Sequence, residues 1–408
     1  MASGQYKDVE QGKINSLEDL ETPLIHEDKI VSYKTDDDGT DHETRSIGMV
    51  LLSTFVAVCG SFGFGSCVGY SAPTQSAIME DLNLTTSQYS MFGSILTIGA
   101  MLGAITSGRI SDYIGRKGAM RMSAGFCITG WLAVFFSTGY LSLDMGRFFT
   151  GYGIGVISFV VPIFIAEIAP KNLRGGLTTL NQVHIQTLQS LPKARILDLF
   201  QRQYIRFVFI GVAIMVFQQF VGINGIGFYA SQTFESAGLS SGTIGTIAYA
   251  CIQVPITIVG ALLIDKSGRK PLIMVSAAGT FLGCFLAGVS FFLKAHSLLL
   301  GWVPIMAVSG VLVYISAFSI GMGAVPWLIM SEIFPINIKG IGGSLVVLVN
   351  WSGAWLVSYT FNFLMNWSSS GTFFLYAGVS LATIVFVAKF VPETKGKTLE
   401  QIHESINS

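Results

Sequence analysis

The sequence predicts an all-α, polytopic membrane protein with ten membrane-crossing helices. Of its 408 residues, 51% are hydrophobic and only 12% are charged, whereas about a quarter of the residues in soluble domains are charged. Long stretches carry no charge, for example those between Ser46 and Met79 and between Gly340 and Ala388. A helix of about 20 apolar residues crosses the hydrocarbon core and satisfies its own backbone hydrogen bonds there.

The apolar segments fall into two groups, four before a polar stretch at 181–206 and six after it. The segments share helical length, high hydrophobicity and few or no charges, which is typical of membrane spans. The expected spans are 47–70, 89–107, 122–141, 144–166, 207–230, 242–264, 271–293, 302–328, 341–363 and 372–391.

These groups divide the chain into five regions. Acidic residues clearly outnumber basic ones in residues 1–45, which favours a disordered, solvated tail. No basic n-region precedes a short apolar core, so we expect no cleaved signal peptide. An N-terminal bundle of four spans (46–175), a cytosolic linker (176–206), a C-terminal bundle of six spans (207–391) and a short tail (392–408) follow.

The positions of lysine and arginine predict the orientation in the bilayer. Basic residues gather in every second loop, for example at Arg109–Arg121 and at Asp265–Lys270. In the intervening loops, Lys294 is the only lysine or arginine. By the positive-inside rule, the basic loops and both termini lie in the cytosol.

Several classes of function are excluded by composition and spacing. The five histidines are scattered, and the five cysteines all fall inside apolar spans, so neither set has the spacing of a metal site or of a disulfide framework. No nucleophile and base are suitably spaced either. We therefore expect no enzyme activity, no cofactor and no metal. The net charge is zero, and no basic patch exists outside the short loops, so nucleic acid is not an expected partner.

Two motifs occur twice along the chain. GRISDYIGRK at Gly108–Lys117 recurs in part as DKSGRK at Asp265–Lys270. PIFIAEIAPKNLRG at Pro162–Gly175 recurs in part as EIFPINIKG at Glu332–Gly340. In both copies of the second motif a basic residue follows the glutamate by seven positions. Two related halves of parallel topology imply a pseudo-two-fold axis along the membrane normal, as in many transporters.

These motifs resemble those of the sugar porters of the major facilitator superfamily. The resemblance also includes QQFVGIN at Gln218–Asn224, Pro326-Trp327 and the closing PETKG at Pro392–Gly396. The acidic tail, SMFGSILTIGAMLGA and KNLRGGLTTLNQ resemble the plant monosaccharide-transporter branch named after early response to dehydration. The resemblance covers nearly everything after residue 46 and implies a major facilitator fold with two helical bundles.

Members of that family have six spans in each half, whereas this sequence predicts four and six. The resemblance runs to Asn181-Gln182 and resumes near Leu191, so the family's fifth and sixth spans have no counterpart. An even number of missing crossings leaves the second half in its orientation, in agreement with the charge pattern. We interpret the chain as a shortened isoform or gene model; a naturally ten-span family is the alternative.

The expected substrate site is rich in amides. Glutamine and asparagine donate and accept hydrogen bonds at once, which suits vicinal sugar hydroxyls, and an indole face packs against the apolar side of a pyranose. Gln218 and Asn224 can approach one side of their helix. Interhelical hydrogen bonding is the alternative for each amide. The resemblance assigns to sugar contact the residues Gln218, Gln219, Asn224, Gln253, Trp327 as the platform, Asn350 and Gln182, whereas Trp351 could equally serve packing.

The charged motifs are expected to act as gates. By resemblance they form bridges at the cytosolic side that hold the halves together when the site faces outward, and exposed ion pairs of this kind are individually weak. The alternative is that they only signal topology. Lys339 stands where the family usually has arginine, which predicts a looser bridge. The gating set comprises Asp112, Arg116, Arg147, Glu167, Arg174, Asp265, Arg269, Glu332 and Lys339.

The first span has no carboxylate. Proton-linked sugar porters carry an aspartate there, paired with an arginine in the fourth span, and the resemblance places Arg147 at that arginine and Cys67 at the acid. Asp144, one turn before Arg147, could neutralise it instead. These residues favour facilitated diffusion over proton symport.

The function expected from the sequence is therefore transport of a monosaccharide, a hexose, by alternating access. Proton–sugar symport is one alternative. A second is a transport-incompetent shortened isoform that binds or regulates a full-length transporter. The expected partners are a small-molecule sugar and the lipid bilayer. The branch resemblance, together with a dileucine-like ETPLI at Glu21–Ile25, favours the vacuolar membrane or else the plasma membrane.

Overall fold

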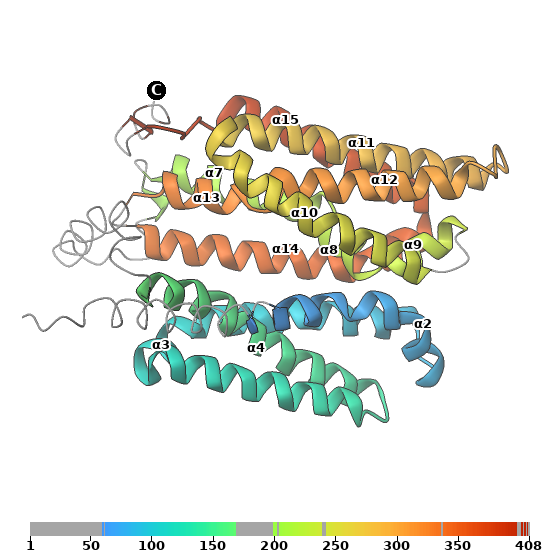
Figure 1. Cartoon of the computed structure of the whole chain (residues 1–408), viewed down its shortest axis with the longest axis horizontal. Coiled ribbons are helices and arrows are strands. Elements are labelled where there is room, and N and C mark those ends of the chain that lie inside the picture. The colour runs from blue at the N-terminus through green and yellow to red at the C-terminus, as the bar shows by residue number, and fades with distance from the viewer. Residues whose placement is uncertain are drawn as a thin grey trace, which may run out of the picture. The chain divides into compact units, whose positions relative to one another are not determined.

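The computed structural model describes helices and no strand within its described residues (Figure 1). The described residues are 59–60, 62–168, 199–201, 204–238, 242–335, 338–397, 401, 402, 404 and 406. The predicted acidic tail, 1–45, and most of the predicted linker, 176–206, lie outside them.

The first half contains a helical segment at 62–69 and the helices α2 (Ser71–Asp81), α3 (Thr86–Phe135) and α4 (Tyr140–Ile168). Helix α3 begins with a capping box, in which the Thr85 hydroxyl accepts from the Gln88 backbone and the Gln88 side chain accepts from the Thr85 backbone. Because this cap satisfies free N–H groups at the first turn, it fixes where the helix starts.

The second half combines four uninterrupted helices of 22–29 residues with shorter helices separated by breaks. Its elements are α7 (Ile205–Phe220), α8 (Ile223–Phe228), α9 (Ala230–Ala237), α10 (Gly242–Ser267), α11 (Arg269–Ala295), α12 (Val303–Ala317), the π-helix η2 (Phe318–Met322), α13 (Val325–Ile333), α14 (Lys339–Trp367) and α15 (Ser369–Phe390).

Seven helical stretches of the described residues are long and apolar enough to cross a membrane. One of them, Thr86–Phe135, covers the predicted span 89–107 and the predicted span 122–141 as far as Phe135, because the chain reverses at Gly115 within α3. The count of ten spans stays a prediction. The seven stretches are Thr86–Phe135, Ile205–Phe228, Gly245–Ile264, Arg269–Ala295, Val303–Ile333, Ile341–Trp367 and Ser369–Phe390.

The internal repeat recurs in the backbone. Gly115 of DYIGRK has φ 75° and ψ 165°, and Gly268 of DKSGRK has φ 91° and ψ 163°. Residues with a side chain rarely adopt this conformation, so glycine is needed at both turns. The two motifs therefore form the same reversal between consecutive spans.

The repeat also recurs in a buried hydrogen bond. The Ser123 hydroxyl of α3 donates to the carbonyl of Gly153 in α4 at 2.7 Å. At the matching place in the second half, the Ser276 hydroxyl of α11 donates to the carbonyl of Ala317 at 2.6 Å. One pair of packed helices is thus built twice with the same polar contact.

Glycines allow the same close helix crossing in both halves. A Cβ on Gly130 would lie 2.7 Å from the carbonyl oxygen of Gly146, and one on Gly283 would lie 2.7 Å from that of Gly310. Small residues let helix backbones approach in this way within membranes. These repeated contacts support the predicted pseudo-two-fold relation of the halves.

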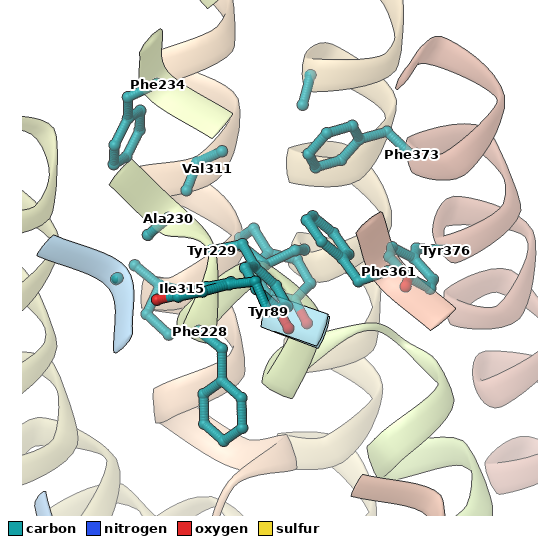
Figure 2. Close-up of a cluster of buried hydrophobic side chains, with 14 of the residues drawn as sticks. Tyr89, Phe228, Tyr229, Ala230, Phe234, Val311, Ile315, Phe361, Phe373 and Tyr376 are labelled. Carbon is teal, nitrogen blue, oxygen red and sulfur yellow. The ribbon is translucent and has the colours of Figure 1, made fainter. Parts of the chain in front are cut away.

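The two halves meet along α3 and α14, and α2 also contacts α8 and α9. One buried cluster spans the seam, in which Tyr89 of the first half lies beside Tyr229 of the second, followed by Phe361 and then Tyr376 (Figure 2). The Tyr229 and Phe361 rings stack with centroids 5.4 Å apart. Both halves therefore contribute to one apolar core at the seam.

Two helix faces lack a cover from any described residue. In an apolar 18-residue window of the Gly245–Ile264 stretch of α10 only 6% of the residues are buried, against 39–50% in the corresponding windows of the other six stretches. Phe135 of α3 is 79% exposed, although its counterpart by the repeat, Gly288 of α11, is buried under the Phe374 ring of α15. The first half has no described equivalent of α14 and α15.

Candidate functional site

A break in the predicted span 207–230 organises the candidate site. Helix α7 ends at Phe220, Gly222 has φ 99°, and α8 begins at Ile223. A Cβ on Gly222 would lie 2.5 Å from the Tyr376 ring, so both the backbone conformation and the available space require glycine. The break places Gln218 and Gln219 before the turn and Asn224 after it.

Three amides from three helices form one hydrogen-bonded chain. Asn224 of α8 donates to the side-chain oxygen of Gln219 of α7 at 2.5 Å, and Gln219 donates to the side-chain oxygen of Asn350 of α14 at 2.6 Å. Gln219 and Asn350 are buried. Each amide keeps further donors or acceptors, so the chain can exchange partners with a polyhydroxylated ligand.

Gln218 lies apart from this chain and contacts a second helix break. Its amide nitrogen donates to the carbonyl oxygens of Met322 at 2.7 Å and of Gly323 at 2.9 Å, where η2 gives way to α13. Its own side-chain oxygen is buried without a partner among the described residues. Gln218 thus stabilises a broken helix and presents one free acceptor.

The remaining predicted sugar contacts do not join the amide chain within the described residues, and one of them lies outside those residues. Trp327 is half-buried at the start of α13, and Gln253 is half-buried on α10, outside the amide chain. Trp351 follows Asn350 and lies against Phe64, with ring centroids 6.5 Å apart. Gln182 lies outside the described residues.

Arg147 is fully buried within the first half. It donates to the backbone carbonyl of Cys67 at 2.7 Å and lies over the rings of Tyr70 and Phe92. Within the described residues it makes no ion pair, and Asp144, although buried, has an oxygen without a partner. Aromatic faces and a carbonyl, rather than a carboxylate, surround this cation here.

The first copy of the charged loop contains an ion pair. Arg116 contacts Asp112 at 3.0 Å, one helical turn away, and also donates to the Ser111 carbonyl. The Asp112 side chain is 76% exposed. A pair of this kind stabilises the end of its own helix only slightly.

The second copy of the loop, at Asp265–Lys270, makes more contacts with other elements than the first copy does. Arg269 contacts Glu332 at 3.0 Å, and the Thr394 hydroxyl also donates to Glu332 at 2.5 Å. Glu393, from the closing PETKG, accepts from the backbone N–H groups of Arg269 and Lys270 at 3.0 Å each. The closing motif therefore caps the start of α11 and joins α13 to it.

The environment of Glu393 changes its acidity. Partial burial raises the pKa of the Glu393 carboxyl, but hydrogen bonds from the backbone N–H groups of Lys395, Arg269 and Lys270 together lower it by more. The pKa therefore lies below the ordinary glutamate value.

Both described ion pairs of the gating set join residues of one half, so the predicted bridging between halves stays a prediction. Glu167 and Asp265 lie in helices α4 and α10, and Lys339 begins α14, but their side chains lie outside the described part of the chain. Arg174 lies outside it altogether.

No group of three or more histidine, cysteine, aspartate or glutamate residues within the described ranges could hold a metal ion. The described residues also bring no nucleophile and base to the amide chain. Its chemistry is that of reversible hydrogen bonding to a neutral polar ligand.

Sequence reasoning missed a set of polar contacts at the end of the bundle opposite the basic loops, here called the distal end. There Gln75 of α2 donates to Gln232 of α9 at 2.6 Å, and Asn362 of α14 donates to Ser90 of α3 at 3.0 Å. Amides inside apolar segments are a usable signal, because they bond between helices in membranes.

The chain matches the family described as "Sugar (and other) transporter" over residues 30–189 and 185–406. It belongs to this sugar transporter family. Sugar transporter ERD6-like 16 of Arabidopsis thaliana is 59% identical over an alignment of 486 positions that covers 100% of this chain and 99% of the relative. Sugar transporter ERD6-like 7 of the same plant is 51% identical, with 88% of this chain and 94% of the relative covered.

Solved structures confirm the predicted fold class of this sugar transporter. A D-xylose-proton symporter matches with a TM-score of 0.68 and 26% identity, covering 85% of this chain and 99% of that one. The inward open conformation of the xylose transporter XylE from E. coli matches with a TM-score of 0.71 and 25% identity, covering 87% and 99%. The protein is therefore an all-α, multi-pass membrane protein with the major facilitator fold.

Proposed function

We propose that this protein carries monosaccharides, hexoses in particular, across its membrane by alternating access. The observation that supports this most is the chain Asn224–Gln219–Asn350, which joins a broken helix to α14 at the seam between the halves. Relatives named as sugar transporters and the likeness to xylose transporters support the same substrate class. We expect no catalysis.

In this proposal Gln219, Asn224 and Asn350 exchange their mutual hydrogen bonds for bonds to sugar hydroxyls. Exchange suits transport, because a site that is satisfied when empty releases its ligand readily. Trp327 remains the proposed platform, with Trp351 beside Asn350 as a second indole at the seam. Gln218, Gln253 and Gln182 remain proposed contacts.

The test is uptake of radiolabelled glucose into liposomes that contain only this chain. We expect saturable uptake that unlabelled hexose inhibits. Negligible uptake by chain whose insertion is confirmed would contradict the proposal. Competition by a polyol that is stronger than that of glucose would move the substrate to another class.

We propose facilitated diffusion rather than proton symport. The support is that Cys67 offers Arg147 only a backbone carbonyl, and that no described carboxylate pairs with that arginine. Glucose uptake should then be insensitive to a protonophore. Uptake that collapses with the protonophore would favour symport.

A second candidate is that this chain is a shortened form that binds or regulates a full-length transporter. The uncovered faces of α10 and α3 support it. The 486 aligned positions of the 59% identical relative also exceed the 408 residues of this chain, so part of that relative has no counterpart here. Recovery of the relative with the tagged chain, together with reduced uptake by the relative, would support this function.

We place the protein in the vacuolar or the plasma membrane with both termini in the cytosol. The alternating basic loops support the orientation. Imaging of a fluorescent fusion would separate the two membranes. Thiol labelling from one side of the membrane would test whether 109–121 and 265–270 face the same compartment.

A further inference from the structure

The distal end of the seam contains a hydrogen bond between two glutamines of different halves. Gln75 of α2 is only 6% exposed and donates to the side-chain oxygen of Gln232 of α9 at 2.6 Å. The two residues are 157 positions apart in the sequence. Because α2 belongs to the first half and α9 to the second, this bond can form only when the distal ends of the halves approach.

A second hydrogen bond joins the same ends through different helices. Asn362 of α14, which is 1% exposed, donates to the hydroxyl of Ser90 near the start of α3 at 3.0 Å. Ser90 also donates to a backbone carbonyl of its own helix. Four helices, two from each half, are thus connected by two side-chain bonds.

Aromatic rings also meet across the seam. The rings of Tyr89 and Tyr229 meet across the seam with centroids 6.2 Å apart, and Tyr229 stacks on Phe361 (Figure 2). A Cβ on Gly93 would lie 2.6 Å from the Tyr229 hydroxyl, so glycine makes room for this ring. The distal end is closed here by close packing as well as by hydrogen bonds.

The closed seam leaves polar atoms unsatisfied. The side-chain oxygens of Gln75 and Asn362 are buried and have no partner within the described residues. Each such atom costs free energy that water would return on opening. These unsatisfied atoms lower the stability of the closed arrangement, which favours separation of this surface during transport.

We propose that the Gln75–Gln232 and Ser90–Asn362 hydrogen bonds form a latch that holds the distal ends of the halves together and opens when the amide site faces that side. The proposal rests on the proposed alternating-access function. By contrast, the described ion pairs at the basic end, Asp112–Arg116 and Arg269–Glu332, each join residues of one half. In this proposal, uncharged side chains rather than ion pairs hold the two halves together at the distal end.

Hydrogen–deuterium exchange of the reconstituted full chain tests the latch without any need for sugar transport. The variants are Gln75→Met and Gln232→Met, which keep the side-chain volume and remove the hydrogen bond. Because one ordinary hydrogen bond is lost, we expect exchange about fivefold faster in peptides from α2 and α9. Exchange at the start of α11, at the basic end, should not change.

The double variant and a matched control sharpen the result. Gln75→Met combined with Gln232→Met should exchange no faster than either single variant, because both remove the same bond. Thr360→Val is the control, since its hydroxyl donates to a carbonyl within α14, and it should leave α2 and α9 unchanged.

Two results would overturn the latch. If α2 and α9 of both single variants exchange deuterium at the wild-type rate, the Gln75–Gln232 bond does not hold the seam. Equal acceleration at the basic end would show general destabilisation instead. Absence of glucose uptake would contradict the proposed function but would leave this measurement and its outcome intact.

Discussion

Gln218 and Gln219 are neighbours in α7, yet their side chains bind different partners. Gln218 satisfies two carbonyls at the break between η2 and α13, whereas Gln219 links Asn224 to Asn350. Successive residues of a helix point about 100° apart, so adjacent amides necessarily meet different neighbours. Gln218 therefore supports the helix break, whereas Gln219 belongs to the amide chain that we propose exchanges its hydrogen bonds for bonds to the sugar.

The contacts of Gln218 predict that its substitution lowers the stability of the protein. Gln218→Met should lower the free energy of unfolding by about 1–3 kcal/mol, because the carbonyls of Met322 and Gly323 lose a buried donor. Thermal unfolding in detergent measures this. A Gln218→Met protein with wild-type stability would show that the break needs no such support.

Acid should weaken the contact between the closing motif and α11. The pKa of Glu393 is depressed in the folded protein, so its stabilisation is present above the ordinary glutamate pKa and is lost as the pH falls through the folded value. Below a pH of about 4.3, the melting temperature of the wild-type chain should fall more than that of Glu393→Gln. Parallel pH profiles would contradict this.

For individual residues, the sequence predicts which amides belong to the candidate site better than it predicts which of them bond to each other. The amide set was identifiable because amides are rare in apolar spans, and Gln219, Asn224 and Asn350 do meet. The sequence paired Gln218 with Asn224, but the turn at Gly222 changes which side of the helix each faces. Gln75 and Gln232 are recognisable as amides near apolar segments, but no local pattern reveals that they pair, because they are 157 positions apart.

At the scale of the element, breaks in helices decide where the site lies. The predicted span 207–230 is divided into α7 and α8, and the predicted span 302–328 is divided into α12, η2 and α13. A hydropathy profile reports how long and how apolar a segment is. A helix break that is buried within the protein changes neither quantity. The spans were therefore predictable, whereas their interruptions were not.

The break at Gly222 should be sensitive to the smallest side chain. Gly222→Ala introduces a methyl group at φ 99° and 2.5 Å from the Tyr376 ring. We expect a loss of about 2 kcal/mol or more in unfolding free energy, measured by thermal unfolding. Gly378→Ala in α15 is the control, because a Cβ there meets nothing within 4 Å. Equal melting temperatures would show that the break is not strained.

At the scale of the whole molecule, two similar halves meet at one seam. The reversals at Gly115 and Gly268 and the serine bonds to Gly153 and Ala317 show that the halves share construction. The duplicated loop motifs made this predictable. Which faces touch across the seam was not, because contacts such as those of α3 with α14 depend on the packing of both halves.

Binding of radiolabelled glucose to the purified chain tests the proposed sugar site without any need for transport, since it requires only the amide chain. We expect saturable binding by the wild type and about tenfold weaker binding by Gln219→Ala, because one sugar hydrogen bond is lost and its neighbours lose their shared partner. Equal affinity of the two proteins, or no binding by a folded wild-type chain, would contradict it.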